Sequence, residues 1–166
     1  MNIYHVVSND NYCKYYENCK AIDTSAINRD INKLSEKKKK LESLFEDVRV
    51  NQFADCPSRL TSLFVFSDIM KDEYEAEWAN VFGNPQYILL TLEIEKGCVK
   101  WFDSSVYMIN GINAQTATQY WKTSSLNFDE IKSDSVEGLF QGVAKIIKRE
   151  SKFYTKGQGI VMMEEL

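Results

Sequence analysis

Short runs of β-branched and aromatic residues recur along the chain, and they predict β-strands. Residues 3–7, IYHVV, form the first run, and residues 86–95, QYILLTLEIE, form the longest. Gly97 is predicted to turn the chain after the longest run. The other strands predicted from such runs are residues 56–66, 98–102 and 157–166.

Other segments repeat their apolar residues at intervals of three and four, which predicts helices. These segments are residues 26–49, 68–82 and 114–122. In the first of them, Asp23, Thr24 or Ser25 would cap the amino end. Its apolar stripe consists of Ile27, Ile31, Leu34, Leu41, Leu44 and Phe45.

The segment VEGLFQGVAKII, residues 136–147, fits either a helix or a strand by periodicity. In a helix, Gly138 and Gly142 would each cost about 1 kcal/mol relative to alanine. In a strand, Glu137 would share one face with Leu139 and Gln141, and the glycines would mark a bulge or a close approach of other atoms. We therefore favour a strand that presents one carboxylate near its start.

The order of these elements is strand, helix, strand, helix and then mostly strands. This order predicts an α+β fold with a mixed or split antiparallel sheet and flanking helices, built as one domain over residues 1–166. A parallel nucleotide-binding fold would need regular alternation and a glycine-rich first turn. Neither G-x-G-x-x-G nor G-x-x-x-x-G-K occurs in the chain.

Charge and composition narrow the class of protein. The formal net charge of −4 and the pI of about 5.1 argue against a general nucleic-acid binder, which usually has a basic face, but they leave a local basic patch open. The run Lys37–Lys40 would suit a nucleic-acid-binding patch, but a solvated helix face is favoured, because Glu36, Glu42 and Glu46 flank it. No secretory signal and no apolar run long enough to span a bilayer is visible, so a cytoplasmic protein without membrane contact is expected.

The four cysteines are irregularly spaced, at positions 13, 19, 56 and 98. With His5 as the single histidine, they do not make a zinc signature, and free thiols in a reducing compartment are expected. A thiol enzyme that pairs a cysteine with His5 is disfavoured, since no nucleophile signature is present.

Several of these segments carry a family resemblance. The pattern E-x-L-x-x-G-x-x-x-I, seen from Glu137 to Ile146, resembles the glutamate strand of ADP-ribosyltransferases. IYHVVS resembles the family's first strand with its histidine, and PSRLTSLFVF resembles its second strand. The order of these segments, together with YILLTLEIE and the pair Tyr120-Trp121, is similar to that of a bacterial and phage branch of ADP-ribosyltransferase-like proteins.

The resemblance implies the fold of that family and NAD as a substrate. Glu137 would stabilise the ribosyl cation that forms as nicotinamide leaves, and His5 would hold the NAD from the first strand. Arg59 would pair with the pyrophosphate. The remaining residues implied to contact NAD are Ser58, Thr61, Ser62, Phe64, Phe66, Tyr120 and Trp121.

The chain departs from the family at Ser135, where arginine-modifying members carry a second Glu or Gln. Arginine is therefore a less favoured acceptor, and the macromolecular target, protein or nucleic acid, stays open, as does the oligomeric state. The alternative function is a non-catalytic interaction protein on the same scaffold, such as a phage accessory or anti-defence protein that blocks a host protein or nucleic-acid enzyme. Without the resemblance, His5, Ser58, Phe66 and Trp121 would be interpreted as ordinary packing or capping residues.

Overall fold

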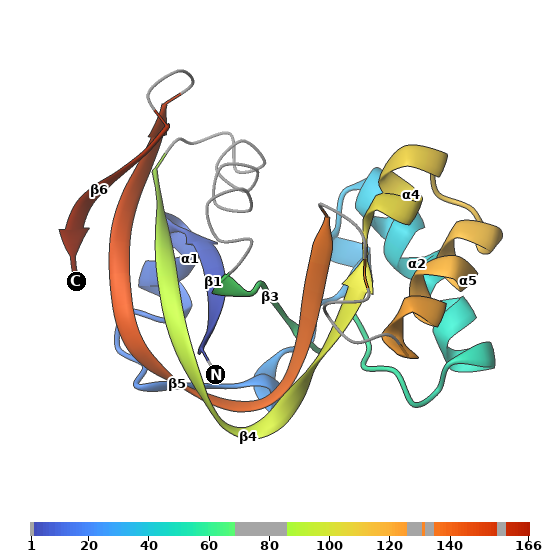
Figure 1. Cartoon of the computed structure of the whole chain (residues 1–166), viewed down its shortest axis with the longest axis horizontal. Coiled ribbons are helices and arrows are strands. Elements are labelled where there is room, and N and C mark those ends of the chain that lie inside the picture. Colours follow the sequence, from blue (N-terminus) through green and yellow to red (C-terminus); the bar gives the residue numbers. More distant parts are fainter. Residues whose placement is uncertain (1, 69–85, 126–130, 132–134, 156–158) are drawn as a thin grey trace. The chain divides into compact units, whose positions relative to one another are not determined.

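The computed structural model describes residues 2–68, 86–125, 131, 135–155 and 159–166, and Figure 1 shows their arrangement. Helices combine with a six-stranded antiparallel sheet of order β1-β4-β5-β2, in which β3 and β6 also pair with β5. The predicted α+β class is therefore confirmed. The strands are β1 (Asn2–Ser8), β2 (Ala21–Asp23), β3 (Leu63–Val65), β4 (Gln86–Asp103), β5 (Val136–Thr155) and β6 (Gly159–Glu165). The helices are α1 (Asn9–Tyr15), α2 (Glu36–Gln52), α4 (Ser105–Asn110) and α5 (Ala114–Lys122), with short 3₁₀ turns at η1 (Thr24–Ala26), η2 (Ile31–Lys33) and η4 (Thr123–Ser125).

The chain divides into two compact units. The first unit comprises Met1–Asp23, Val65–Gly97 and Gly142–Leu166, and the second comprises Thr24–Phe64 and Cys98–Gln141. Each of the long strands β4 and β5 contributes residues to both units. Because these strands are shared, the assignment of residues 1–166 to one domain stays a prediction.

The first unit is built on the pairing of β1 with β4. The strands are antiparallel, with Ile3 opposite Leu92 and Val6 opposite Leu89. All four side chains are buried, as the apolar runs predict. The predicted strand at the carboxyl end is also confirmed, as β6 pairs with β5.

Two glycines allow the backbones of β4 and β5 to approach each other closely within the first unit. The predicted turn at Gly97 is wrong, because β4 continues through it and includes residues 98–102. Gly97 and Gly142 both have positive φ, at 102° and 144°. A Cβ on Gly142 would lie 1.9 Å from the carbonyl oxygen of Lys96, so no other residue fits there. The strand prediction for residues 136–147 is confirmed, and the close approach explains one of its glycines.

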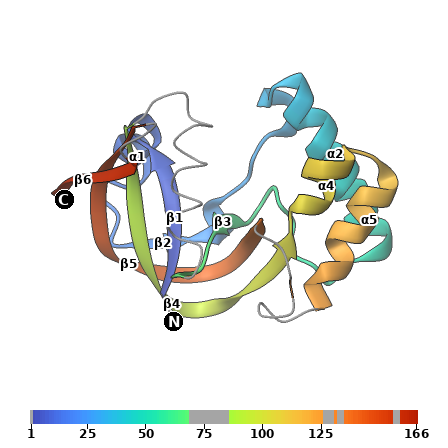
Figure 2. The ribbon, with the colours of Figure 1, turned by 45° about the horizontal axis from the view of Figure 1, so that its top comes forward.

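The second unit is built on α2, α4 and α5, which pack together in Figures 1 and 2. The predicted helix at residues 26–49 is wrong at its start, because α2 begins only at Glu36. Leu34 has extended backbone, and Asp30 accepts a hydrogen bond from the amide of Asn32, which stabilises the separate turn η2. The core of this unit consists of Phe45, Val48, Cys56, Phe102, Ala117, Tyr120, Trp121 and Leu139.

The segment before β3 differs from its prediction. Of the strand expected at residues 56–66, only Leu63–Val65 is regular strand, and Phe66 adds a single bridge to Tyr4. The preceding residues form a loop whose carbonyl groups at Arg59 and Ser62 both accept hydrogen bonds from the Arg29 guanidinium, at 2.7 Å each. A side chain therefore satisfies backbone groups that a strand would have paired.

The remaining predictions divide between confirmed and untested ones. The helix at residues 114–122 is confirmed as α5, and its start is fixed by a reciprocal capping box between Asn113 and Thr116. The helix predicted at residues 68–82 lies, apart from Asp68, outside the described residues. None of the helices in the described part of the chain has the length and apolar character needed to cross a membrane.

Candidate functional site

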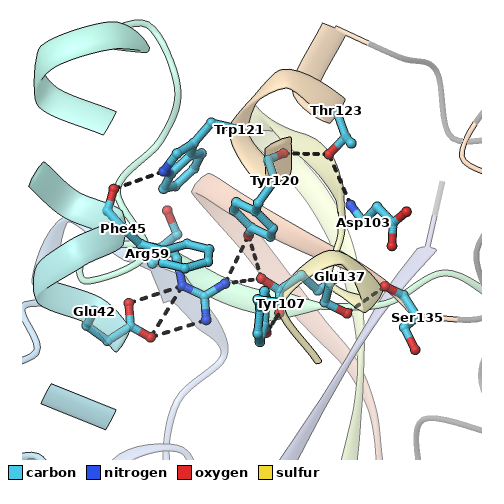
Figure 3. Close-up of polar contacts among 12 residues, drawn as sticks. Glu42, Phe45, Arg59, Asp103, Tyr107, Tyr120, Trp121, Thr123, Ser135 and Glu137 are labelled. Carbon is cyan, nitrogen blue, oxygen red and sulfur yellow. Dashed lines mark hydrogen bonds and ion pairs between the residues drawn. The ribbon is translucent and has the colours of Figure 1, made fainter. Parts of the chain in front are cut away.

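A buried arginine between two carboxylates forms the centre of the second unit. The Arg59 side chain is only 5% exposed, and its guanidinium faces Glu42 on one side and Glu137 on the other (Figure 3). Arg59 Nε donates to Glu42 Oε2 at 3.1 Å, and Nη2 donates to Glu42 Oε1 at 3.2 Å. Arg59 Nη1 donates to Glu137 Oε1. The planar guanidinium of Arg59 therefore binds two carboxylates at once.

Two tyrosines complete the surroundings of the Glu137 carboxylate. The Tyr120 hydroxyl donates to Glu137 Oε1, the same oxygen that accepts from Arg59. Glu137 Oε2 has, among the described residues, only the Tyr107 hydroxyl, at 3.5 Å. That separation is long for an O–H···O hydrogen bond, which is usually 2.5–3.0 Å. One oxygen of Glu137 is therefore held firmly, while the other keeps most of its capacity to accept a hydrogen bond.

Aromatic rings enclose the guanidinium of Arg59. Ring centroids of Phe64, Tyr120, Phe45 and Tyr107 lie 4.9 to 5.7 Å from its central carbon. Rings at this distance attract a cation through their quadrupoles, and they also exclude water. Arg59 is thus fixed both by its hydrogen bonds and by packing.

The cluster of Glu42, Arg59, Tyr107, Tyr120 and Glu137, called here the Arg59 cluster, is electrostatically unbalanced. Two carboxylates share one guanidinium, which leaves about one net negative charge when both acids are ionised. Burial by itself lowers the pKa of Arg59, but the neighbouring Glu137, Tyr120, Tyr107 and Glu42 outweigh burial and raise this pKa. Burial, followed by the charge of Glu137, raises the pKa values of Tyr107 and Tyr120, so both phenols stay protonated at neutral pH.

Each member of the Arg59 cluster comes from a different part of the second unit. Glu42 lies on α2, Tyr107 on α4 and Tyr120 on α5. Arg59 lies in the loop before β3, and Glu137 is the second residue of β5. Long-range contacts hold these elements together, such as the bond from Trp121 Nε1 on α5 to the Phe45 carbonyl on α2, at 2.9 Å.

The structure brings together three of the residues predicted from the sequence. Arg59, Tyr120 and Glu137 share one hydrogen-bonded cluster. The predicted pairing of Arg59 with a pyrophosphate would require its guanidinium to exchange protein partners for the ligand. Tyr120 and Trp121 are fully buried, so stacking on a nicotinamide ring would require these rings to be uncovered.

The predicted hydroxyl residues lie in the loop beside Arg59. The Ser58 hydroxyl donates to Glu46 Oε2 at 2.8 Å, and the Ser62 hydroxyl donates to the Ser58 carbonyl at 2.7 Å. Gln141 Nε2 donates to the Thr61 hydroxyl at 3.3 Å. Ser58, Thr61 and Gln141 line a hollow of about 380 Å³ within the second unit. The other residues around this hollow are Arg49, Ala54, Asp55, Cys56, Pro57, Cys98, Lys100 and Leu139.

His5 and Phe66 belong to the first unit. The His5 ring meets Tyr16 edge to face, with centroids 5.8 Å apart. The Phe66 ring stacks on Tyr4 at 5.8 Å and is buried. The NAD contacts implied for these two residues therefore stay predictions.

Glu42 and Tyr107 belong to the Arg59 cluster but were not predicted from the sequence. Glu42 was interpreted only as an acid flanking the lysine run, since the register of α2 against the loop at Arg59 depends on tertiary packing. Tyr107 lies on α4, a helix too short for its periodicity to indicate it. Within the described residues, no three His, Cys, Asp or Glu side chains are grouped to hold a metal ion, and the four cysteines are free thiols.

Comparison with protein families identifies the family of the chain. A family model described as protein of unknown function (DUF2441) matches residues 2–152, so the chain belongs to this family. Comparison with curated proteins finds no match. Neither result links the chain to ADP-ribosyltransferases.

Proposed function

We propose that the protein is an ADP-ribosyltransferase-like enzyme that transfers ADP-ribose from NAD to a macromolecular target. The observation that carries this proposal is the asymmetry of the Glu137 carboxylate. Its Oε1 is fixed by Arg59 and Tyr120, whereas its Oε2 has only a distant contact with Tyr107. A ribose hydroxyl can take the place of that weak contact without breaking the strong ones.

The charge of the Arg59 cluster supports the same chemistry. As the bond between nicotinamide and ribose stretches, positive charge develops on the ribose. With both acids ionised, about one excess negative charge at a site of low exposure would stabilise that charge more in the transition state than in the ground state. Glu137 is the member with an oxygen available for this role, so we assign it the stabilisation of the ribosyl cation.

The proposal gives supporting roles to the neighbouring residues. Arg59 and Tyr120 hold Glu137 in one orientation, which removes the need for the carboxylate to reorganise during the reaction. The hollow lined by Ser58 and Thr61 is also lined by Leu139 and Gln141, which follow Glu137 on alternate positions of β5. At about 3.3 Å per strand residue, Leu139 lies roughly 7 Å along the strand from Glu137, a distance within the span of a nucleotide. NAD is the substrate in this proposal.

Release of nicotinamide from NAD tests the proposal. We expect wild-type protein to release nicotinamide, measured by chromatography, and Glu137→Gln to reduce the rate by about a hundredfold or more, because one charged group directed at the transition state is lost. Glu165→Gln is the matched control, since it removes the same charge from a carboxylate that is 63% exposed. The proposal is wrong if folded Glu137→Gln protein releases nicotinamide at the wild-type rate, or if the wild type releases none with any acceptor supplied.

A second function is favoured by the burial of the predicted NAD contacts. Arg59 is engaged on all sides, and Tyr120 and Trp121 are fully enclosed. In a non-catalytic interaction protein, the Arg59 cluster would be structural, and an outer surface would bind a partner. Partner binding that excess NAD and Glu137→Gln both leave unchanged would favour this function over the enzymatic one.

A further inference from the structure

The amino-terminal turns of α2 carry a concentrated positive charge. Between residues 29 and 40 the chain has six basic residues against two acidic ones, although its total charge is −4. Lys37, Lys38 and Lys40 are exposed, and Lys39 is half-buried. Among the described residues, no carboxylate lies within ion-pair distance of these four lysines, whereas Lys33 meets Asp30 at 3.8 Å.

The lysines continue the face of α2 that packs into the core. Leu41, Phe45 and Val48 follow each other at intervals of four and three, and all pack in the core of the second unit. Lys37 and Lys38 precede Leu41 by four and three residues, so they lie on the same face of the helix. They are exposed because this end of α2 extends past α4 and α5 (Figure 2).

Helix stability does not account for this placement. Cations near the amino end of a helix are disfavoured by the helix dipole, and an i, i+4 pair is best when the acid precedes the base. Here Lys38 precedes Glu42, and Glu42 is already bound by Arg59. Glu36 precedes Lys40 by four residues in the favourable order, but their charged groups do not lie within ion-pair distance. The lysines therefore gain little from α2 itself, and an external anion would stabilise them.

We infer that Lys37, Lys38 and Lys40 form a docking surface for the phosphate backbone of a nucleic acid. Lysine is a point charge that contacts phosphates without reading bases, so the binding is independent of sequence. The exposed turns read EKKKK and have no apolar face to insert into a membrane, so binding to a membrane would depend on charge alone. Protein interfaces are depleted of lysine at their centres, which makes an acidic protein a poorer match.

This inference is independent of NAD chemistry. It places a bound strand at the end of α2, the same helix that supplies Glu42 to the Arg59 cluster. Lys38 and Glu42 are four residues apart, about 6 Å along the helix axis. The net negative charge of the whole protein predicts weak binding that is lost as salt rises.

The test measures binding of a fluorescent DNA duplex by anisotropy at several salt concentrations. Three phosphate contacts predict a slope of log K against log salt of about −2.7. We expect Lys37→Gln/Lys38→Gln/Lys40→Gln to weaken binding at low salt by about tenfold or more and to flatten this slope. The corresponding arginine variant keeps the charge and should keep the binding.

The matched control is Lys14→Gln/Lys20→Gln/Lys145→Gln, which removes the same charge from exposed positions of the first unit. Equal loss in the two glutamine variants would overturn the inference, since only net charge would then matter. It would also be overturned if the wild type binds no duplex at low salt, or binds anionic vesicles or a polyglutamate peptide but not DNA. Circular dichroism of each variant confirms folding, and the salt slope of the wild type tests the inference without any variant.

Discussion

Two groups of charges in this molecule have the same balance of charge but differ in the burial of their cation. In the second unit, Arg59 lies between Glu42 and Glu137, with side chains 5%, 13% and 12% exposed. In the first unit, Lys148 lies between Glu150 and Glu165, at 3.2 and 3.6 Å, and these side chains are 40%, 8% and 63% exposed. Both groups set one cation against two carboxylates, and both use β5.

The comparison shows that burial decides what such a group can do. Lys148 and Glu165 are 40% and 63% exposed, so water and salt screen their charges, whereas Glu150 is buried beside an exposed cation. Around Arg59, aromatic rings exclude water and hydrogen bonds fix the orientations, so the charges are screened less than at the surface. Of these two groups, the Arg59 cluster is the one that combines a buried cation with fixed orientations.

The largest effect is expected from removing Arg59. Arg59→Met leaves two buried carboxylates without their shared partner, and we expect it to lower the free energy of unfolding by about 3–5 kcal/mol, measured by urea denaturation. Adding Glu42→Gln and Glu137→Gln removes the unpaired charges and should restore most of this loss. If the triple variant has as low a free energy of unfolding as Arg59→Met, the arginine stabilises the protein through packing. The difference between the two groups would then not be electrostatic.

Local patterns in the sequence predict the elements of this fold better than their ends. The apolar runs predict the paired strands β1 and β4, and the stripe that ends at Trp121 predicts α5. The start of α2 was missed because hydrogen bonds at Asp30 compete with helical ones, a balance that periodicity does not contain. Gly97 was mistaken for a turn because its positive φ serves a close approach to Gly142, which is distant in sequence.

The candidate site shows the same limit. Glu137 and Arg59 were both named from the sequence, and only the structure shows that they bind each other. Glu42 was overlooked, since no local rule connects α2 to a loop that follows it. The sequence indicates which side chains are suited to catalysis or binding, whereas their pairing depends on tertiary contacts.

The next effect appears at alkaline pH and sharpens the contrast. The pKa of Tyr107 is raised above its usual value of 10.0 by burial and by Glu137. In the unfolded chain this phenol ionises near pH 10 while in the folded protein it stays protonated, so the free energy of unfolding falls as pH rises above 10. We expect Tyr107→Phe to show a shallower fall in thermal melts between neutral and alkaline pH. Tyr15→Phe, which removes an exposed phenol, should keep the wild-type slope.

The smallest effect is expected in the first unit. Glu165→Gln removes an exposed carboxylate from the Lys148 group, and we expect no resolvable change in the urea midpoint, because screened pairs contribute little. The urea midpoints of the wild type and the variant should agree at both low and high salt. A loss of stability as large as that of Arg59→Met would contradict the distinction between the two groups.

The most direct test of the central claim, that the Arg59 cluster serves NAD, is a thermal-shift titration with NAD. A ligand that binds only the folded state raises the melting temperature in proportion to the logarithm of its concentration once it exceeds its Kd. We predict that NAD raises the melting temperature of the wild type and of Glu165→Gln, and that Glu137→Gln shows a smaller shift. A wild-type melting temperature that does not change with NAD up to millimolar concentration would contradict the account.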